Sequence, residues 1–212
     1  MQSKAQPKFG NQDVEIIGEE IAYQGFHTIN RVRLKHRLYK GGWSEVIDRE
    51  VSDRGSAASV VAYDPSSDSV CLVEQFRVAT KAADKSPWSL EIVAGMIDKE
   101  SESPNEVVLR ELVEEAGLVP DYLEKITSYW VSPGGSSARM YIYVALCDLS
   151  GAGGIYGLDD EQEDILAVVV PRESVYQSAL ADETGNAATL IGLQWLTMNR
   201  ERMYHIWHAK DE

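Results

Sequence analysis

Three things are scarce in this sequence: basic residues, cysteines and long apolar runs. The 212 residues carry 20 Lys and Arg against 34 Asp and Glu, a formal net charge of −14. Because nucleic acids and anionic membranes are held by clustered basic side chains, we expect neither as a partner. The two cysteines, Cys71 and Cys147, lack a C-x-x-C spacing, which is typical of free thiols in a reducing compartment. Without a signal-peptide pattern or an apolar run of roughly 18 residues, a cytoplasmic location is predicted.

Strand patterns dominate the first quarter of the chain. Residues 14–51 read as three short strands with a Gly41-Gly42 turn and no helix, so they lack a core of their own. We expect this ribbon to pack on the rest of the chain or on a second subunit. The remainder mixes strands, for example near 58–65 and 69–80, with helices near 103–116, 173–182 and 186–207. The sequence predicts an α+β protein with an N-terminal β domain, 1–55, and a larger domain, 56–212.

The helix predicted over 103–116 has the clearest limits. Ser103 and Glu106 form a capping-box pattern, Pro104 occupies the first helical position, and Gly117 is typical of a helix end. A helical wheel separates two groups of residues. Leu109, Leu112, Val113 and Ala116 lie on one side, and Glu111, Glu114 and Glu115 lie on the other. We therefore predict a core face and, opposite it, a face of carboxylates.

Two interpretations of the carboxylate face remain open. The ordinary one is a solvated acidic surface. However, Glu111 and Glu115 are a like-charged i,i+4 pair, and acids in the last turn oppose the helix dipole. Arg110 can offset Glu114, which leaves the other two without a cation. A divalent cation such as Mg²⁺ would remove this repulsion, since hard carboxylate oxygens are its preferred ligands.

The wider pattern carries a family resemblance. The run G-x6-E-x7-R-E-L-x-E-E-x-G-L, from Gly95 to Leu118, resembles the Nudix box, with one extra residue before Glu102. Either Glu100 or Glu102 could fill the first Glu position. Further on, the segment SPGG at 132–135 is similar to an element of the ADP-ribose pyrophosphatase branch of Nudix hydrolases. The resemblance covers nearly the whole chain. It implies the Nudix fold, a mixed β-sheet sandwiched between helices, and a small N-terminal antiparallel sheet that exchanges between subunits of a homodimer.

The resemblance also implies roles for particular residues. Glu111, Glu115 and the Ala94 carbonyl would bind Mg²⁺ or Mn²⁺, with two or more ions in each site. Arg110 would orient the carboxylates, and Glu114 would be a further ligand or a supporting group. Either Glu161 or Glu163, in the acidic loop, would act as general base. The expected substrate-binding residues are Arg49, Arg54, Arg77, Phe26, Pro133, Gly134 and Gly135, with Phe26 contacting adenine from the partner subunit.

The activity implied is hydrolysis of the pyrophosphate bond of ADP-ribose, a nucleoside diphosphate sugar, to AMP and ribose 5-phosphate. Ala138 stands where relatives commonly have Glu, and this departure leaves a second sugar-nucleotide substrate open. The alternative is a GDP-mannose or other sugar-nucleotide pyrophosphatase. A catalytically silent ligand sensor of the same fold is a different class, and the complete set of box carboxylates disfavours it.

Overall fold

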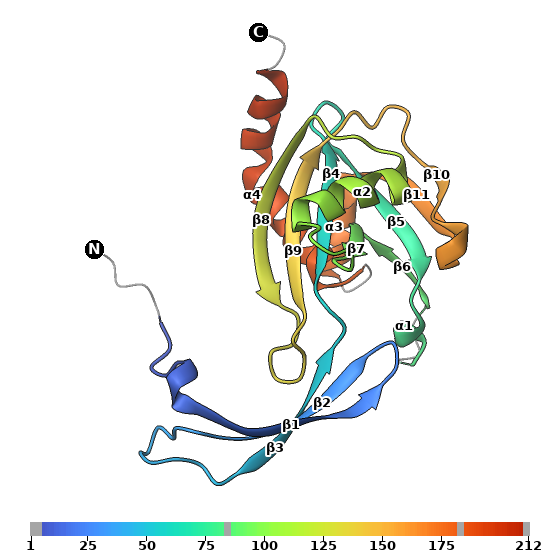
Figure 1. Cartoon of the computed structure of the whole chain (residues 1–212). Coiled ribbons are helices and arrows are strands. Elements are labelled where there is room, and N and C mark those ends of the chain that lie inside the picture. The colour runs from blue at the N-terminus through green and yellow to red at the C-terminus, as the bar shows by residue number, and fades with distance from the viewer. Residues whose placement is uncertain (1–5, 83–85, 182–184, 210–212) are drawn as a thin grey trace. The chain divides into compact units, whose positions relative to one another are not determined.

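The structure is a computed structural model that describes residues 6–82, 86–181 and 185–209. The chain divides into two compact units (Figure 1). The smaller unit comprises Met1–Gly55 and Trp130–Ala138, and the larger comprises Ser56–Tyr129 and Arg139–Glu212. The border between the units falls after Gly55, and the segment 130–138 returns to the smaller unit.

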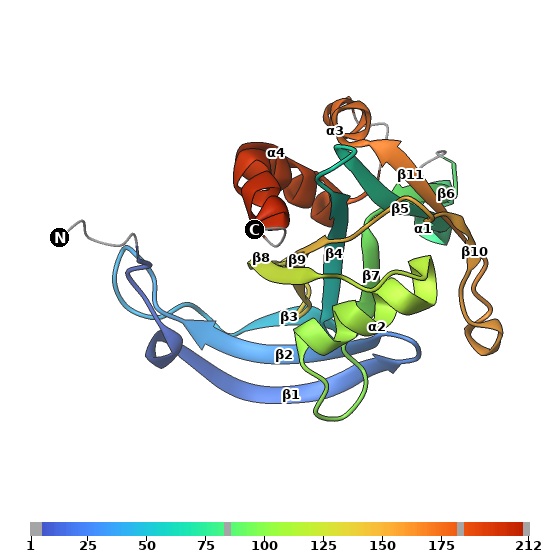
Figure 2. The same ribbon diagram turned by 90° about the horizontal axis from the view of Figure 1, so that it is seen from above.

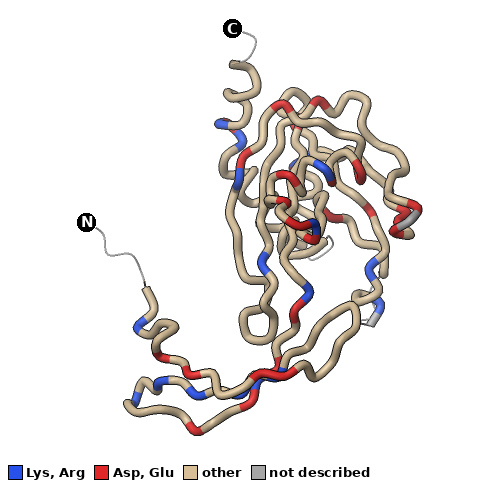
Figure 3. The backbone as a smooth tube through the Cα atoms, in the orientation of Figure 1, with Lys and Arg blue, Asp and Glu red and all other residues tan. Residues whose placement is uncertain are grey.

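The smaller unit is a three-stranded antiparallel sheet. A 3₁₀ turn, Asn11–Asp13, leads into β1 (Val14–Gln24), β2 (Thr28–His36) and β3 (Ile47–Asp53), in the order β1-β2-β3. Acidic and basic residues are interleaved along these strands (Figure 3), and Lys35 Nζ lies 2.9 Å from Glu15 Oε2. None of the described side chains of this unit is buried. The sheet therefore consists of hydrogen-bonded strands without an apolar core.

The larger unit is built on an eight-stranded mixed sheet. Its strands are β4 (Ala57–Asp64), β5 (Ser69–Phe76), β6 (Trp88–Glu91), β7 (Val93–Met96), β8 (Tyr122–Trp130), β9 (Arg139–Leu146), β10 (Gly154–Tyr156) and β11 (Ile165–Pro171). The main path is β10-β11-β5-β4-β9-β8, while β6 pairs with β5 and β7 pairs with β4. β4 runs parallel to β9 and antiparallel to β5 and β7. β4 therefore has three neighbouring strands, and it is almost wholly buried.

Helices cover both faces of this sheet. Figure 2 shows α2 (Pro104–Ala116) on one side, and α3 (Arg172–Leu180) and α4 (Ala187–His208) on the other. Each face has its own apolar cluster. Leu112 of α2 packs with Val60 and Val73 on one face, and Leu193 of α4 packs with Val61 and Leu72 on the other. The predicted mixed sheet between helices is confirmed.

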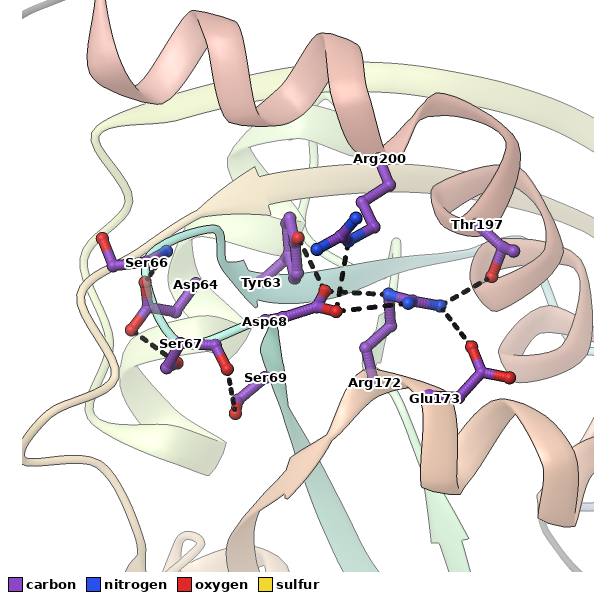
Figure 4. A network of polar contacts seen from close by, with 10 residues as sticks. All are labelled: Tyr63, Asp64, Ser66, Ser67, Asp68, Ser69, Arg172, Glu173, Thr197 and Arg200. Atoms are coloured by element: carbon purple, nitrogen blue, oxygen red, sulfur yellow. Dashed lines mark hydrogen bonds and ion pairs between the residues drawn. The ribbon is translucent and has the colours of Figure 1, made fainter.

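A network of ion pairs ties the β4–β5 turn to α3 and α4 (Figure 4). Asp68 lies in this turn with φ = 51°, a left-handed conformation that Asp tolerates better than most residues. Its carboxylate accepts hydrogen bonds from Arg172 Nε at 2.9 Å, Arg172 Nη2 at 3.2 Å and the Tyr63 hydroxyl at 2.9 Å. Arg200 Nε lies 3.1 Å from Asp68 Oδ2, the oxygen that also accepts from Arg172 Nη2. The network therefore joins the two C-terminal helices to the sheet.

One predicted strand ends earlier than expected. β5 stops at Phe76, and residues Val78–Ala82 form a short helix, α1. The Thr80 hydroxyl donates to the Arg77 carbonyl at 2.9 Å, a local bond that favours a turn over an extended strand.

Both cysteines are free and buried, and burial raises the pKa of Cys71 to about 11 and that of Cys147 to about 12. Within the described ranges, none of the helices has the length and apolar character needed to cross a membrane.

Candidate active site

The limits of α2 follow from its caps. The Ser103 backbone N–H donates to the Glu106 carboxylate at 2.8 Å, completing the predicted capping box, and Pro104 begins the helix. At the other end Gly117 has φ = 64°, and its N–H bonds to the Val113 carbonyl at 3.0 Å. The predicted helix is confirmed at both ends. These caps fix which turn carries each box glutamate.

The orientation of α2, however, corrects the sequence prediction. The predicted core positions Leu109 and Val113 are exposed, whereas Glu111 is 9% and Glu115 only 2% exposed. Val107 and Val108 are also buried, and they lie on the same side of the helix as these two glutamates. The wheel was wrong because it placed the glutamates opposite the apolar residues. They lie between Val107 and Leu112 on the side that faces the sheet, so a solvated acidic surface is excluded for Glu111 and Glu115.

Arg110 gathers the remaining box acids. Its Nη1 donates to Glu111 Oε1 at 2.7 Å and to Glu114 Oε2 at 2.8 Å. On its other side, Nε donates to Glu102 Oε1 at 2.9 Å and Nη2 to Glu102 Oε2 at 3.2 Å. Hydrogen bonds to Glu102, first of all, raise the pKa of Arg110. Glu102 thus makes the contact to Arg110 from the loop before α2. One guanidinium serves three carboxylates, so the box is short of positive charge.

The two buried glutamates, Glu111 and Glu115, have raised pKa values. Burial raises the pKa of Glu115 to about 8, although a hydrogen bond from the Ala94 N–H, at 3.1 Å, partly opposes it. Burial likewise raises the pKa of Glu111 to about 7 against the charge of Arg110. Each is raised further by a neighbouring carboxylate, including Glu163 in both cases. Pairs of acids whose charges are not compensated mark functional sites more often than structural ones.

Gly95 makes room for one of these carboxylates. A Cβ added at position 95 would lie 1.8 Å from Glu111 Oε1 and 2.1 Å from its Cδ, well inside contact distance. The backbone of β7 therefore passes directly beside the Glu111 side chain. The glycine that opens the box is needed for this close approach, and not for a special φ angle.

The acidic loop approaches the carboxyl end of α2. A 3₁₀ turn, Asp159–Glu161, contains one of the two predicted bases, and Glu163 follows it. The Gly157 N–H donates to the Glu114 carbonyl at 3.2 Å, which anchors the loop to the helix. Glu163 is half-buried and acts on both buried glutamates through its charge, whereas Glu161 is exposed. Their division of roles stays a prediction.

The predicted substrate-binding residues fall in both units. In the larger unit, Arg77 pairs with Glu91 at 3.1 Å, and its charge lowers the pKa of Glu115. In the smaller unit, the Arg54 guanidinium lies 5.5 Å from the centre of the Phe26 ring, and Arg49 Nη1 donates to the Asp48 carbonyl at 2.8 Å. The segment Pro133, Gly134 and Gly135 is also there, and the Gly135 carbonyl accepts the Ser52 N–H at 2.8 Å. The structure thus brings Arg77 to the box and gathers the others on the smaller unit.

Glu91 is a site residue that was not predicted from the sequence. It is a buried carboxylate three residues before Ala94, and it holds Arg77. Its only signal was an acidic residue inside an apolar run, Leu90-Glu91-Ile92, which is rarely fully buried without a partner.

The donor set suits a hard divalent cation. Among the described residues, no three His, Cys, Asp or Glu side chains are grouped as a complete metal site. Two buried carboxylates, Glu111 and Glu115, stand side by side with raised pKa values. Mg²⁺ is usually held by one or two carboxylates, with water and substrate phosphates completing its shell, so the pair fits this ion.

Comparison with known proteins gives the family. The model of the NUDIX domain matches residues 53–191, about two thirds of the chain and the whole of the site around α2. The chain belongs to the NUDIX family. The NUDIX match includes β4, where the larger unit begins, and extends into α4.

Several curated NUDIX relatives match almost end to end. An ADP-ribose pyrophosphatase of Haemophilus influenzae is 44% identical over 202 residues, covering 94% of this chain and 93% of the relative. The protein of the same name from Escherichia coli K12 is 44% identical over 199 residues, covering 94% and 95%. A GDP-mannose pyrophosphatase of Enterobacter sp. is more distant, at 30% identity over 190 residues, covering 88% and 96%.

A solved structure supports the NUDIX fold independently. A crystal structure of an ADP compounds hydrolase matches with a TM-score of 0.69, and the match covers 92% of this chain and 98% of the other. At 23% sequence identity, this likeness concerns the fold alone.

Proposed function

We propose that this protein hydrolyses the pyrophosphate bond of ADP-ribose to AMP and ribose 5-phosphate with Mg²⁺. The observation that carries the proposal is the pair of buried carboxylates, Glu111 and Glu115, on the face of α2 that packs on the sheet. A protein that buries two acids without full compensation has a use for a cation there. The curated ADP-ribose pyrophosphatases, at 44% identity over nearly the whole chain, support this substrate.

In the proposed mechanism, Glu111 and Glu115 hold the metal, and the Ala94 carbonyl and Glu114 complete or support its shell. The bound ion supplies charge neutralisation at the diphosphate and lowers the pKa of a water. Arg110 fixes two of the carboxylates in position through its bonds at 2.7 and 2.8 Å. Either Glu163 or Glu161 accepts the proton from the attacking water. Arg77 neutralises charge on the phosphates. Mn²⁺ and more than one ion are compatible with the same oxygen ligands.

We further propose that the protein works as a homodimer through the smaller unit. The described side chains of its sheet are all at least partly exposed, and Phe26 is 82% exposed. A second copy would cover this surface and bring Phe26, Arg49 and Arg54 to the adenine and phosphates of the substrate. Analytical ultracentrifugation tests this: a monomer at micromolar concentration would contradict it. A cytoplasmic location stays a prediction.

A substrate panel with product identification tests the activity. We expect ADP-ribose with Mg²⁺ to give AMP and ribose 5-phosphate, and we expect a lower kcat/KM for GDP-mannose. Equal or faster turnover of GDP-mannose would favour the second candidate, which Ala138 and the relative at 30% identity support. Binding of ADP-ribose without turnover of any sugar nucleotide would instead indicate the ligand sensor.

A further inference from the structure

The ribbon formed by β5 and β6 places three polar residues close together. Val73 pairs with Glu91 and Gln75 pairs with Ser89 in an antiparallel register. Val73 packs in the apolar cluster under α2, so the alternating residue Gln75 and the cross-strand neighbour Glu91 share that face of the sheet. Arg77 follows at the next alternate position. This polar strip on the α2 side includes only one residue, Arg77, that the resemblance singled out.

Gln75 is buried with an unused donor. The residue is 7% exposed, and among the residues that the structure describes its Nε2 has no hydrogen-bond partner. Most buried side-chain donors are paired, because an unpaired one keeps the full penalty of lost hydration. A buried amide N–H₂ therefore points to an acceptor that the chain itself does not provide.

Glu91 and Arg77 form a pair with unequal burial. Glu91 is 4% exposed and accepts from Arg77 Nη2 at 3.1 Å and from Nε at 3.3 Å, both on the same oxygen. The Arg77 side chain is 42% exposed, so part of its guanidinium remains open to a further ligand. A buried carboxylate that holds two of its nitrogens restricts the rotamers of Arg77.

This strip adjoins the box carboxylates. Glu91 lies three residues before Ala94, whose N–H bonds to Glu115 at 3.1 Å, and the charge of Arg77 acts on Glu115. A diphosphate held through a cation at Glu111 and Glu115 would therefore lie beside this part of the sheet. A phosphate oxygen is an acceptor only, which matches an amide donor and a guanidinium edge.

We propose that Gln75 is a substrate-binding residue whose amide donates to a diphosphate oxygen, and that Glu91 is a positioning residue for Arg77 in the same subsite. The proposal rests on the proposed function, which supplies the diphosphate. It adds two residues of β5 and β6 to the site on α2.

The Gln75→Met variant tests the first part. Met has a similar length and no donor, so it removes an unpaired polar group from the core. We expect the unfolding midpoint without ligand to stay the same or rise, while KM for ADP-ribose rises about tenfold, as for one lost hydrogen bond to a charged group. A lower midpoint with unchanged KM would overturn the assignment, since it would show that the amide is satisfied within the fold.

A double-mutant cycle tests the second part. We expect Glu91→Gln to raise KM for ADP-ribose about tenfold, with a smaller change in kcat, and to have no further effect on KM in an Arg77→Met background. Glu74→Gln is the matched control, because Glu74, on the neighbouring strand β5, is exposed and points to the opposite face of the sheet. An equal effect of Glu91→Gln in both backgrounds would overturn the positioning role. If the Arg77→Met variant does not fold, Glu91→Gln alone is the test. A raised KM with a smaller change in kcat supports the positioning role, and an unchanged KM overturns it.

Binding of inorganic pyrophosphate with Mg²⁺ separates this proposal from the proposed function. We expect Gln75→Met and Glu91→Gln to weaken this binding about tenfold in calorimetry, whichever nucleotide sugar the wild-type enzyme hydrolyses. Unchanged pyrophosphate affinity in both variants, beside wild-type turnover of ADP-ribose, would overturn the subsite and leave the activity standing. If the wild type does not hydrolyse ADP-ribose but the variants bind pyrophosphate more weakly, the proposed activity is overturned and the subsite stands.

Discussion

Two groups of charged side chains in the larger unit differ in how they compensate burial. Around Asp68, the carboxylate receives Arg172, Arg200 and the Tyr63 hydroxyl. Burial alone would raise the pKa of Asp68, but the hydrogen bonds from Arg172 and Tyr63 outweigh it, and the pKa is lowered. On α2, burial outweighs the available donors, and the pKa values of Glu111 and Glu115 are raised.

The difference separates a cluster that is satisfied within the chain from the pair of acids for which we propose a bound metal. The Asp68 network is complete within the chain, and it joins secondary-structure elements that lie far apart in sequence. Burial raises the pKa values of the α2 pair, so ionisation of these acids weakens the fold unless a cation compensates their charge. Counting acidic and basic residues would not distinguish them; the balance of donors around each carboxylate does.

The largest expected effect is on catalysis. Glu115→Gln should keep the fold and lower kcat/KM for ADP-ribose by about a thousandfold or more, since a metal ligand supplies several kcal/mol of transition-state stabilisation. Steady-state kinetics with Mg²⁺ measures this, and the exposed Glu74→Gln is the control. Near-wild-type turnover of the Glu115 variant would refute the ligand assignment.

The next effect is on stability. Asp68→Asn keeps a residue that tolerates a positive φ but leaves the buried Arg172 without its main partner. We expect the free energy of unfolding to fall by about 1–3 kcal/mol, the scale for leaving a buried donor without its partner when that partner is itself partly exposed. Urea denaturation measures it. The kcat of the remaining folded protein should be unchanged, and a large loss of kcat would contradict a purely structural network.

The pH dependence of stability should have opposite signs for the two groups. Glu115, with its pKa raised from 4.5 to about 8, binds more protons folded than unfolded, so the metal-free protein should lose stability as pH rises from about 5 to 8. Asp68, with its lowered pKa, contributes stability above about pH 4 that is lost only in acid. Thermal unfolding at several pH values, with chelator, measures both.

Two comparisons make the pH experiment decisive. Glu115→Gln should be more stable than the wild type at pH 8 in chelator and similar at pH 5, because it removes the group that must ionise. Saturating Mg²⁺ should reduce the slope of the wild type, since a metal bound only by the folded state stabilises it. A wild-type slope that is unchanged by the substitution would show that Glu115 is not the titrating group.

The smallest expected effect concerns the exposed side of α2. Val113 is 51% exposed, so Val113→Lys should change the free energy of unfolding by less than about 0.5 kcal/mol. Leu112→Ala, one position earlier and fully buried, should lower it by about 2–5 kcal/mol. Urea titration of the pair checks the rotation of the helix. A large loss for Val113→Lys would restore the orientation first predicted.

The sequence predicted the ends of α2 better than its rotation. Ser103, Glu106 and Gly117 act through local backbone bonds, so their pattern alone locates the helix. Which face is buried depends on the sheet beneath, and a scale that treats Glu as always exposed assigns it wrongly. Val107 and Val108 were the available signal, since they share a side with Glu111.

Contacts between residues far apart in the chain could not be predicted from the sequence for the same reason. Asp68 and Arg172 are separated by 104 positions, and only the pairing of β5 with β11 brings them together. The ion pair of the buried Glu91 with the partly exposed Arg77 likewise depends on the register of β6 against β5. Residue types and spacing identified the box carboxylates, but a register set by tertiary packing cannot be read from a local pattern.

The space beside Gly95 bears on how natural variants of this enzyme should be read. A methyl group at position 95 would collide with the Glu111 carboxylate, so an alanine there displaces the acid without replacing it. A survey that looks only for intact glutamates would class such a variant as active. In the proposed mechanism, a hydrogen atom at position 95 is as much a condition of the chemistry as the acid beside it.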